Sequence, residues 1–101
     1  MIARLWTCRT PLSKADAFEA HLLATGVAEV KKTPGNLGAT ILRREAGGVA
    51  HFVMISYWED FTAIQAFAGQ DLDRAWLHGD DALFDLDPDM FVTHHQVIRR
   101  D

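Results

Sequence analysis

The sequence of 101 residues predicts one α+β domain, in which a four-stranded antiparallel sheet carries two helices on one face. Strand-like and helix-like segments follow one another in the order β-α-β-β-α-β, without an internal repeat or a linker. The Gly47-Gly48 pair between the two middle strand-like runs is typical of a tight hairpin. With 49% hydrophobic and 24% charged residues, the composition is that of a globular domain spanning residues 1–101.

The first strand and the first helix are expected between residues 2 and 32. Ile2 to Arg9 combines aromatic and branched side chains and is followed by Thr10-Pro11, which predicts a strand. From Ser13 to about Lys32 an alanine-rich segment predicts a helix that ends at the turn residues Thr33-Pro34-Gly35-Asn36. Its inward positions recur at helical spacing: Ala15, Phe18, Leu22 and Gly26.

The two middle strands are Gly38 to Ala46 and Val49 to Trp58, and the two-residue loop between them fixes their register. If Ala46 faces Val49, the pairs that follow are Arg44 with His51, Leu42 with Val53 and Ile41 with Met54. One face of the hairpin then carries Thr40, Leu42, Val53, Ile55 and Tyr57, and the other carries Ala39, Ile41, Phe52, Met54, Ser56 and Trp58. Both faces are largely apolar, whereas antiparallel sheets commonly keep one face polar.

The second half of the chain predicts a second helix and a last strand. Glu59-Asp60 caps a helix that Gly69 interrupts and that restarts at Leu72, Ala75 and Trp76. Asp85 to Asp89 is expected to be a loop, and Met90 to Arg100 alternates like a strand. The resulting order is that of a ferredoxin-like fold, with the first and third strands in the centre of the sheet.

An uncovered apolar sheet face predicts a second copy of the chain as its partner. The two helices lie on one face, so the other face would expose a patch larger than soluble monomers tolerate. A two-fold homodimer that packs sheet against sheet is the simplest closed arrangement.

Composition and charge exclude several partners. The formal net charge of −4 and the absence of a basic run argue against nucleic acid. No segment has the length and apolarity of a membrane helix or a signal peptide, and the single cysteine, Cys8, cannot form an internal disulfide. We therefore expect a soluble, cytoplasmic protein.

Several stretches of the chain resemble the antibiotic-biosynthesis monooxygenase-like family of dimeric α+β barrels. They are Met1 to Arg4 with Trp6, the Thr33 to Asn36 turn, Ser56 to Asp60 with the helix that follows up to Gly69, Asp81 with Phe84, and Val92 to Val97. The resemblance covers nearly the whole chain and implies a dimeric barrel and a monooxygenase-like activity. His78 and His95 stand where the family often has an aromatic residue, so a role that depends on a phenol is in question there.

Three residues are the candidates for catalysis: His94, His78 and Arg4. His94 is either a general base or a hydrogen-bonded sheet histidine, and its neighbour His95 must point to the opposite face. His78 is followed by Asp80 and Asp81, which could orient an imidazole base, although a simple loop explains this segment as well. Arg4 could hold an anionic oxygen or form an ion pair with an acidic residue.

Aromatic side chains dominate the candidate substrate-binding set. Trp6, Trp58 and Trp76 would suit a flat aromatic ligand, and they are equally plausible as core residues. Tyr57 and Asp81, both from stretches that carry the resemblance, complete this set. No spacing of His, Cys or carboxylate residues predicts a metal site, and no cofactor is expected.

Three functions follow from these residues and the resemblance. The first is cofactor-independent oxygenation of an aromatic or polyketide-like small molecule by a homodimer. The second is non-catalytic, a small-molecule-binding or stress-response barrel. The third, haem degradation, is disfavoured, because the haem-degrading branch has an Asn on the first strand and a Trp and a His in or after the second helix. This chain has its single Asn at position 36, and Phe67 and Trp76 near the other two positions, although His78 follows two residues after Trp76.

Overall fold

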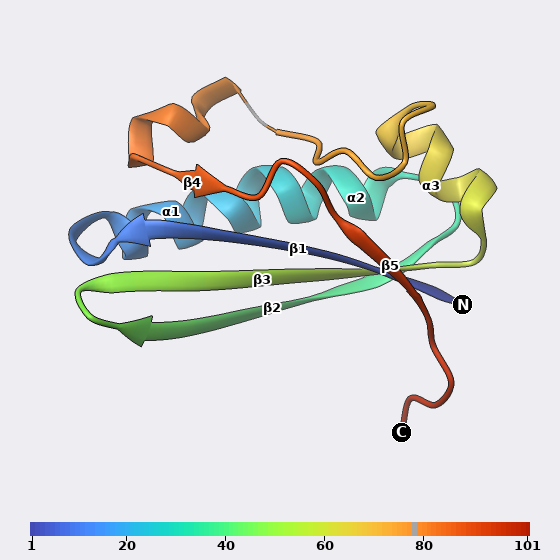
Figure 1. The fold of residues 1–101 in the computed structure, drawn as a ribbon. Helices are drawn as coiled ribbons and strands as arrows, with labels where there is room; N and C mark the ends of the chain where they lie inside the picture. The colour runs from blue at the N-terminus through green and yellow to red at the C-terminus, as the bar shows by residue number, and fades with distance from the viewer. Residues whose placement is uncertain (78) are drawn as a thin grey trace.

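The computed structural model describes residues 1–77 and 79–101, and it has the predicted α+β architecture. A long strand β1 (Ile2–Pro11) is followed by a 3₁₀ turn η1 (Leu12–Lys14) and an almost continuous helical stretch. This stretch consists of α1 (Ala15–Leu22), a π-helical turn η2 (Leu23–Val27) and α2 (Ala28–Lys32). Figure 1 shows α1 and α2 lying along the length of the sheet.

Strands β2 (Asn36–Ala46) and β3 (Val49–Trp58) form the predicted hairpin. Both loop glycines have positive φ, 58° at Gly47 and 76° at Gly48, as a primed turn requires. The observed register pairs Ala46 with Val49, Leu42 with Val53 and Ile41 with Met54, so the predicted register is confirmed.

The remaining elements are short. Helix α3 (Phe61–Ala68) is capped by Asp60, whose carboxylate accepts a hydrogen bond from the Ala63 backbone at 2.9 Å, and it ends at Gly69 with φ 83°. A 3₁₀ turn η3 (Gly79–Phe84) precedes β4 (Asp87–Pro88) and β5 (Thr93–Gln96). No helix among the described residues is long and apolar enough to cross a membrane.

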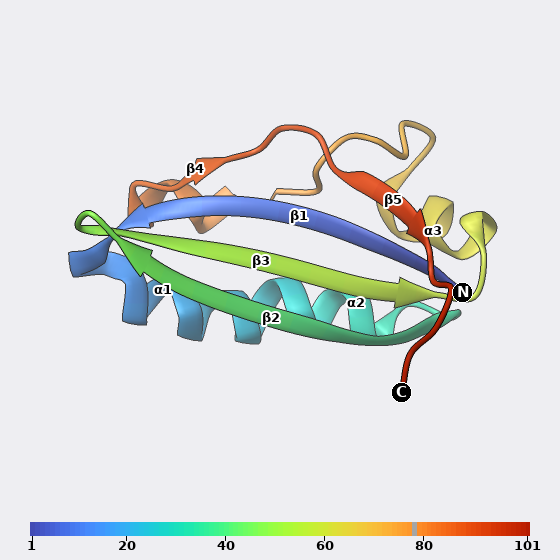
Figure 2. The ribbon, with the colours of Figure 1, turned by 60° about the horizontal axis from the view of Figure 1, so that its bottom comes forward.

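The sheet order is β2-β3-β1, with β4 and β5 both pairing with the outer side of β1, so the first and third strands are central as predicted (Figure 2). Helices cover one face of this sheet. Burial along β3 alternates strictly, and Phe52, Met54, Ser56 and Trp58 are buried on the helix side. On the other side, Leu42 remains 49% exposed in the single chain. The two-faced hairpin is therefore confirmed.

Three element predictions were wrong. Residues 70–77, called the strap below, do not restart a helix. They form a single turn, closed by a hydrogen bond of 3.2 Å from the Arg74 amide to the Asp71 carbonyl, and contact the C-terminal segment through an isolated bridge between Arg74 and Phe91. The predicted strand over residues 90–100 is reduced to β5, and a part of the expected loop forms β4. The reason is a change of partner: Ala75 donates to the Met90 carbonyl at 2.9 Å, and Val92 donates to the Asp73 carbonyl at 2.7 Å. Met90 to Val92 therefore pairs with the strap and leaves β1.

Candidate active site

A pocket lies between the helical stretch, the sheet and the strap. The unfilled space between these elements is about 520 Å³, including open solvent at the mouth of the pocket. The lining is mostly apolar, and the described residues that form it are Arg4, Trp6, Leu22, Gly26, Val30, Met54, Ser56, Phe67, Trp76 and Val92. An apolar concave site with few polar groups is the usual form of a small-molecule site.

Arg4 is the charged residue of this lining. It extends from β1 towards the helices, and the residue is only 4% exposed. Its guanidinium donates to the carbonyl oxygen of Leu72, to that of Arg74 at 2.8 Å and to Nε2 of His94 at 3.0 Å. Burial lowers the pKa of Arg4 to about 10, partly offset by Asp73, so the side chain is charged at neutral pH. Among the described residues, these bonds engage three of its five N–H groups.

His94 on β5 is paired with Arg4 across the sheet, and its side chain is 8% exposed. Since a guanidinium can only donate, Nε2 of His94 must accept, which assigns the proton of the neutral ring to Nδ1. Nδ1 faces the Asp73 carboxylate at 3.5 Å, and the Phe61 ring packs edge-on at 5.6 Å. Burial, followed by the Arg4 charge, lowers the pKa of His94, so the imidazole is neutral at pH 7.

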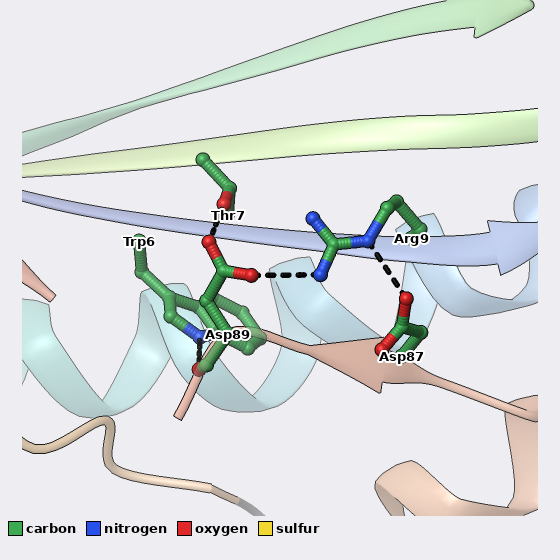
Figure 3. A network of polar contacts seen from close by, with 5 residues as sticks. All are labelled: Trp6, Thr7, Arg9, Asp87 and Asp89. Carbon is green, nitrogen blue, oxygen red and sulfur yellow. Dashed lines mark hydrogen bonds and ion pairs between the residues drawn. The ribbon is translucent and has the colours of Figure 1, made fainter. Parts of the chain in front are cut away.

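The segment before β5 is fastened to β1 by a second polar network (Figure 3). The Asp89 carboxylate accepts hydrogen bonds from the Thr7 hydroxyl and from Nη2 of Arg9 at 2.7 Å, and Asp87 accepts from Nε of Arg9 at 2.9 Å. The backbone carbonyl of Asp89 accepts from the indole N–H of Trp6 at 2.8 Å. The network thus fixes the orientation of the Trp6 ring, which lines the pocket. The Thr7 and Arg9 contacts hold the pKa of Asp89 below its usual value.

The structure brings together several of the predicted site residues. Arg4 and Trp6 share the helix-side face of β1, and Trp76 reaches the same pocket from the strap. Trp58 is fully buried behind Phe67, whose ring lies 5.5 Å from it, and it belongs to the core beside the pocket. Trp58, Phe67 and Trp76 form a continuous aromatic row, with a Phe67–Trp76 ring distance of 5.6 Å.

The remaining predicted residues lie elsewhere. Tyr57 is on the opposite face of the sheet, where its hydroxyl is 3.3 Å from that of Thr40 and Arg100 stacks on its ring at 4.0 Å, so the geometry does not bring it to this pocket. His95 is exposed and bonds Thr93 at 2.8 Å, which agrees with opposite orientations of the two neighbouring histidines. His78 lies outside the described residues. Asp81 falls within η3, and only its place in that turn is described.

Sequence reasoning missed Asp73, Phe67 and Met54. A sequence signal exists for Phe67 and Met54. Met54 lies at an alternate position on the helix-side face of its strand, and Phe67 lies on the apolar stripe of its helix. Asp73 carries none, because its contact with His94 depends on the path of the strap, which distant residues determine.

The geometry defines a ferredoxin-like α+β protein with a mostly apolar pocket between its helices and its sheet. A family model described as "Antibiotic biosynthesis monooxygenase" matches residues 1–78, and the chain belongs to this family. No curated protein matches the sequence significantly.

Solved structures support the fold over the entire chain. A candidate antibiotic biosynthesis monooxygenase from Deinococcus radiodurans is 18% identical with a TM-score of 0.65, covering 100% of this chain and 96% of its own. A point mutant of MhuD, with two manganese protoporphyrin IX bound per active site, is 21% identical, with a TM-score of 0.65 and 100% and 98% coverage. MhuD from Mycobacterium tuberculosis, a heme-degrader with two hemes in its active site, is 18% identical, with a TM-score of 0.64 and 100% and 99% coverage.

The described pocket residues do not fit haem ligation. The described lining contains no imidazole, thiolate or phenolate, and both nitrogens of the adjacent His94 face protein groups at 3.0 and 3.5 Å. Across residues 1–77 and 79–101, no group of three or more His, Cys, Asp or Glu side chains is placed to hold a metal ion.

Proposed function

We propose that this protein is a monooxygenase that oxidises an aromatic or polyketide-like small molecule without a bound metal or flavin. One observation carries the proposal: a buried, charged Arg4 in the wall of an aromatic-lined pocket lies 3.0 Å from the neutral imidazole of His94, which stands directly behind it. A flat molecule with an acidic C–H group, such as an anthrone, matches this combination. Its anion is delocalised onto an oxygen that a guanidinium can bind.

The chemistry begins with proton transfer from the substrate methylene to Nε2 of His94. Once Nε2 is protonated, it can no longer accept a hydrogen bond from Arg4. The Arg4 N–H that made this bond is then available to the new substrate oxyanion. The carbanion then forms a C–O bond with O₂, and protonation gives a hydroperoxide. Loss of water from this hydroperoxide leaves a carbonyl, so that the methylene compound and O₂ yield a ketone and water. His78 is the alternative base.

One observation favours a second candidate, non-catalytic binding of an aromatic anion. In the structure, Nε2 of His94 already accepts from Arg4, so the base is occupied before a ligand arrives. If this bond persists when the ligand is bound, Arg4 still offers its remaining N–H groups to an anion, and no proton is removed.

Oxygen uptake separates the two candidates. With anthrone and a series of hydroquinones, we expect the wild type to consume O₂, His94→Gln to be at least about 100-fold slower, and His95→Gln to stay within about twofold. The matched His95 variant removes an exposed imidazole one residue away. Ligand binding without any O₂ uptake would favour the binder, and the absence of both would refute the proposed pocket function.

The proposed active form is a two-fold homodimer in which the sheets face each other. The supporting observation is the exposed apolar face, where Leu42 is 49% exposed beside the half-buried Val53 and Ile55. Burying such an area stabilises association by about 25 cal/mol per Å², less the entropy of association. Sedimentation at low micromolar concentration should give about twice the chain mass of 11.3 kDa. A folded monomer there would refute this assembly.

A further inference from the structure

The helical stretch is widened at the point where it passes the pocket. Residues Leu23–Val27 form the π-helical turn η2, between the regular helices α1 and α2. Turns of π-helix are rare overall, and many of those that occur lie at functional sites. Gly26 lies in this turn and lines the pocket, with Leu22 and Val30 four residues away on either side, also in the lining.

The backbone does not require glycine at this position. The described positive-φ glycines are at positions 35, 38, 47, 48 and 69, and Gly26 is not among them. Within a helix, glycine is the least favourable residue other than proline. A Cβ atom here would lie 3.0 Å from Cδ1 of Leu22 and 3.9 Å from Sδ of Met54, and both neighbours line the pocket. The missing side chain therefore keeps open a part of the pocket that a methyl group, or the Leu22 side chain displaced by it, would fill.

We propose that Gly26 determines specificity by setting the upper size limit of the pocket's ligand. A fused aromatic anion of three rings would use the space beside Gly26, while its charged group meets Arg4. A one-ring anion would bind Arg4 without reaching this space. The inference rests on the proposed function, because it assumes that the pocket binds an aromatic anion.

Calorimetric titration with benzoate, 2-naphthoate and 2-anthroate tests this proposal, since the three carboxylates share one charge and differ in ring number. For the wild type we expect the affinity to increase with ring number. In Gly26→Ala the ratio of 2-anthroate to benzoate affinity should fall at least tenfold, with benzoate within threefold of the wild type. Gly26→Val should lower this ratio further. Ala24→Val, at an exposed position of the same turn, is the matched control and should leave the ratio unchanged.

Three results would overturn the proposal: an unchanged ratio in a folded Gly26→Ala, equal losses for all three ligands, or no binding of any of them by the wild type. Circular dichroism establishes that each variant is folded. If Gly26→Val does not fold, Gly26→Ala and Gly26→Ser decide. Oxygen uptake is a separate measurement, so a wild type that binds by size but consumes no O₂ would refute the oxygenase function and leave this inference intact.

Discussion

Replacing Arg4 with Met tests whether the buried guanidinium holds the strap over the pocket. The substitution leaves two carbonyl oxygens, of Leu72 and Arg74, and Nε2 of His94 without their donor. At about 2 kcal/mol for each buried unsatisfied group, the loss is about 6 kcal/mol. Removing the charge of Arg4 also removes the cost of burying it, which offsets part of this loss. A pKa lowered from 12.5 to about 10 corresponds to roughly 3 kcal/mol.

The expected net loss is therefore about 3 kcal/mol, which lowers Tm by roughly 12–24 °C in a domain of this size. Urea unfolding at one fixed protein concentration measures the free energy, because a dimer makes stability depend on concentration. Arg43→Met is the matched control. Like Arg4, Arg43 makes three contacts; its partners are three carboxylates at 2.7 to 3.3 Å. Because these contacts are at the surface, a much smaller loss of stability is expected.

Hydrogen exchange gives an independent measure of the strap. The amide of Ala75, which donates to Met90, should exchange faster in Arg4→Met and remain protected in Arg43→Met. Equal stability losses in the two variants, together with an unchanged Ala75 amide, would refute the reasoning that Arg4 fastens the strap.

Three further predictions concern titratable groups. Because the folded pKa of His94 is lowered, the unfolded chain binds more protons, so stability is complete above about pH 6.5 and decreases as the pH falls towards the folded pKa. Urea unfolding of His94→Gln between pH 7 and 5 should show a weaker pH dependence than that of the wild type. Asp73→Asn should lower the pKa of His94 further in an NMR titration, because Asp73 raises it, whereas Asp71→Asn should not; equal shifts in both would contradict this contact. Asp89→Asn should lower the free energy of unfolding by up to about 1 kcal/mol at pH 7, measured by urea unfolding. The difference from the wild type should shrink as the pH falls below about 4, because the contacts that lower the pKa of Asp89 stabilise only its charged form. A constant difference down to pH 3 would show that the charge is not responsible.

The sequence alone was sufficient for the hairpin because its determinants are local. Two glycines with positive φ close the loop, and a two-residue loop allows a single register. The faces of β2 and β3 follow from that register. Arg4 and Trp6 share a face of β1 because side chains two residues apart on a strand point to the same side. The placement of these two residues in one pocket was therefore accessible before the structure.

The path of the strap could not be predicted from the sequence, because the contacts that determine it are not local. Leu72, Ala75 and Trp76 fit a helical period, but their segment is held by distant groups: Arg4 binds two of its carbonyls, and Met90 and Val92 bond its backbone. These contacts connect residues 15 to 70 positions apart, and no local pattern encodes them. The same path places Asp73 beside His94, so the partner that orients the imidazole was missed together with the strap.

The charges around the pocket support the proposal of an aromatic monoanion as its ligand. Arg4 stays charged up to about pH 10, whereas His94, with its lowered pKa, is neutral at pH 7. The described lining contains no carboxylate, and Asp73 reaches His94 from an exposed position outside the lining. At neutral pH the described lining therefore carries one positive charge in apolar surroundings. In such surroundings a delocalised aromatic anion gains both ion pairing and apolar contact, while a strongly hydrated dianion would lose more solvation than one guanidinium returns.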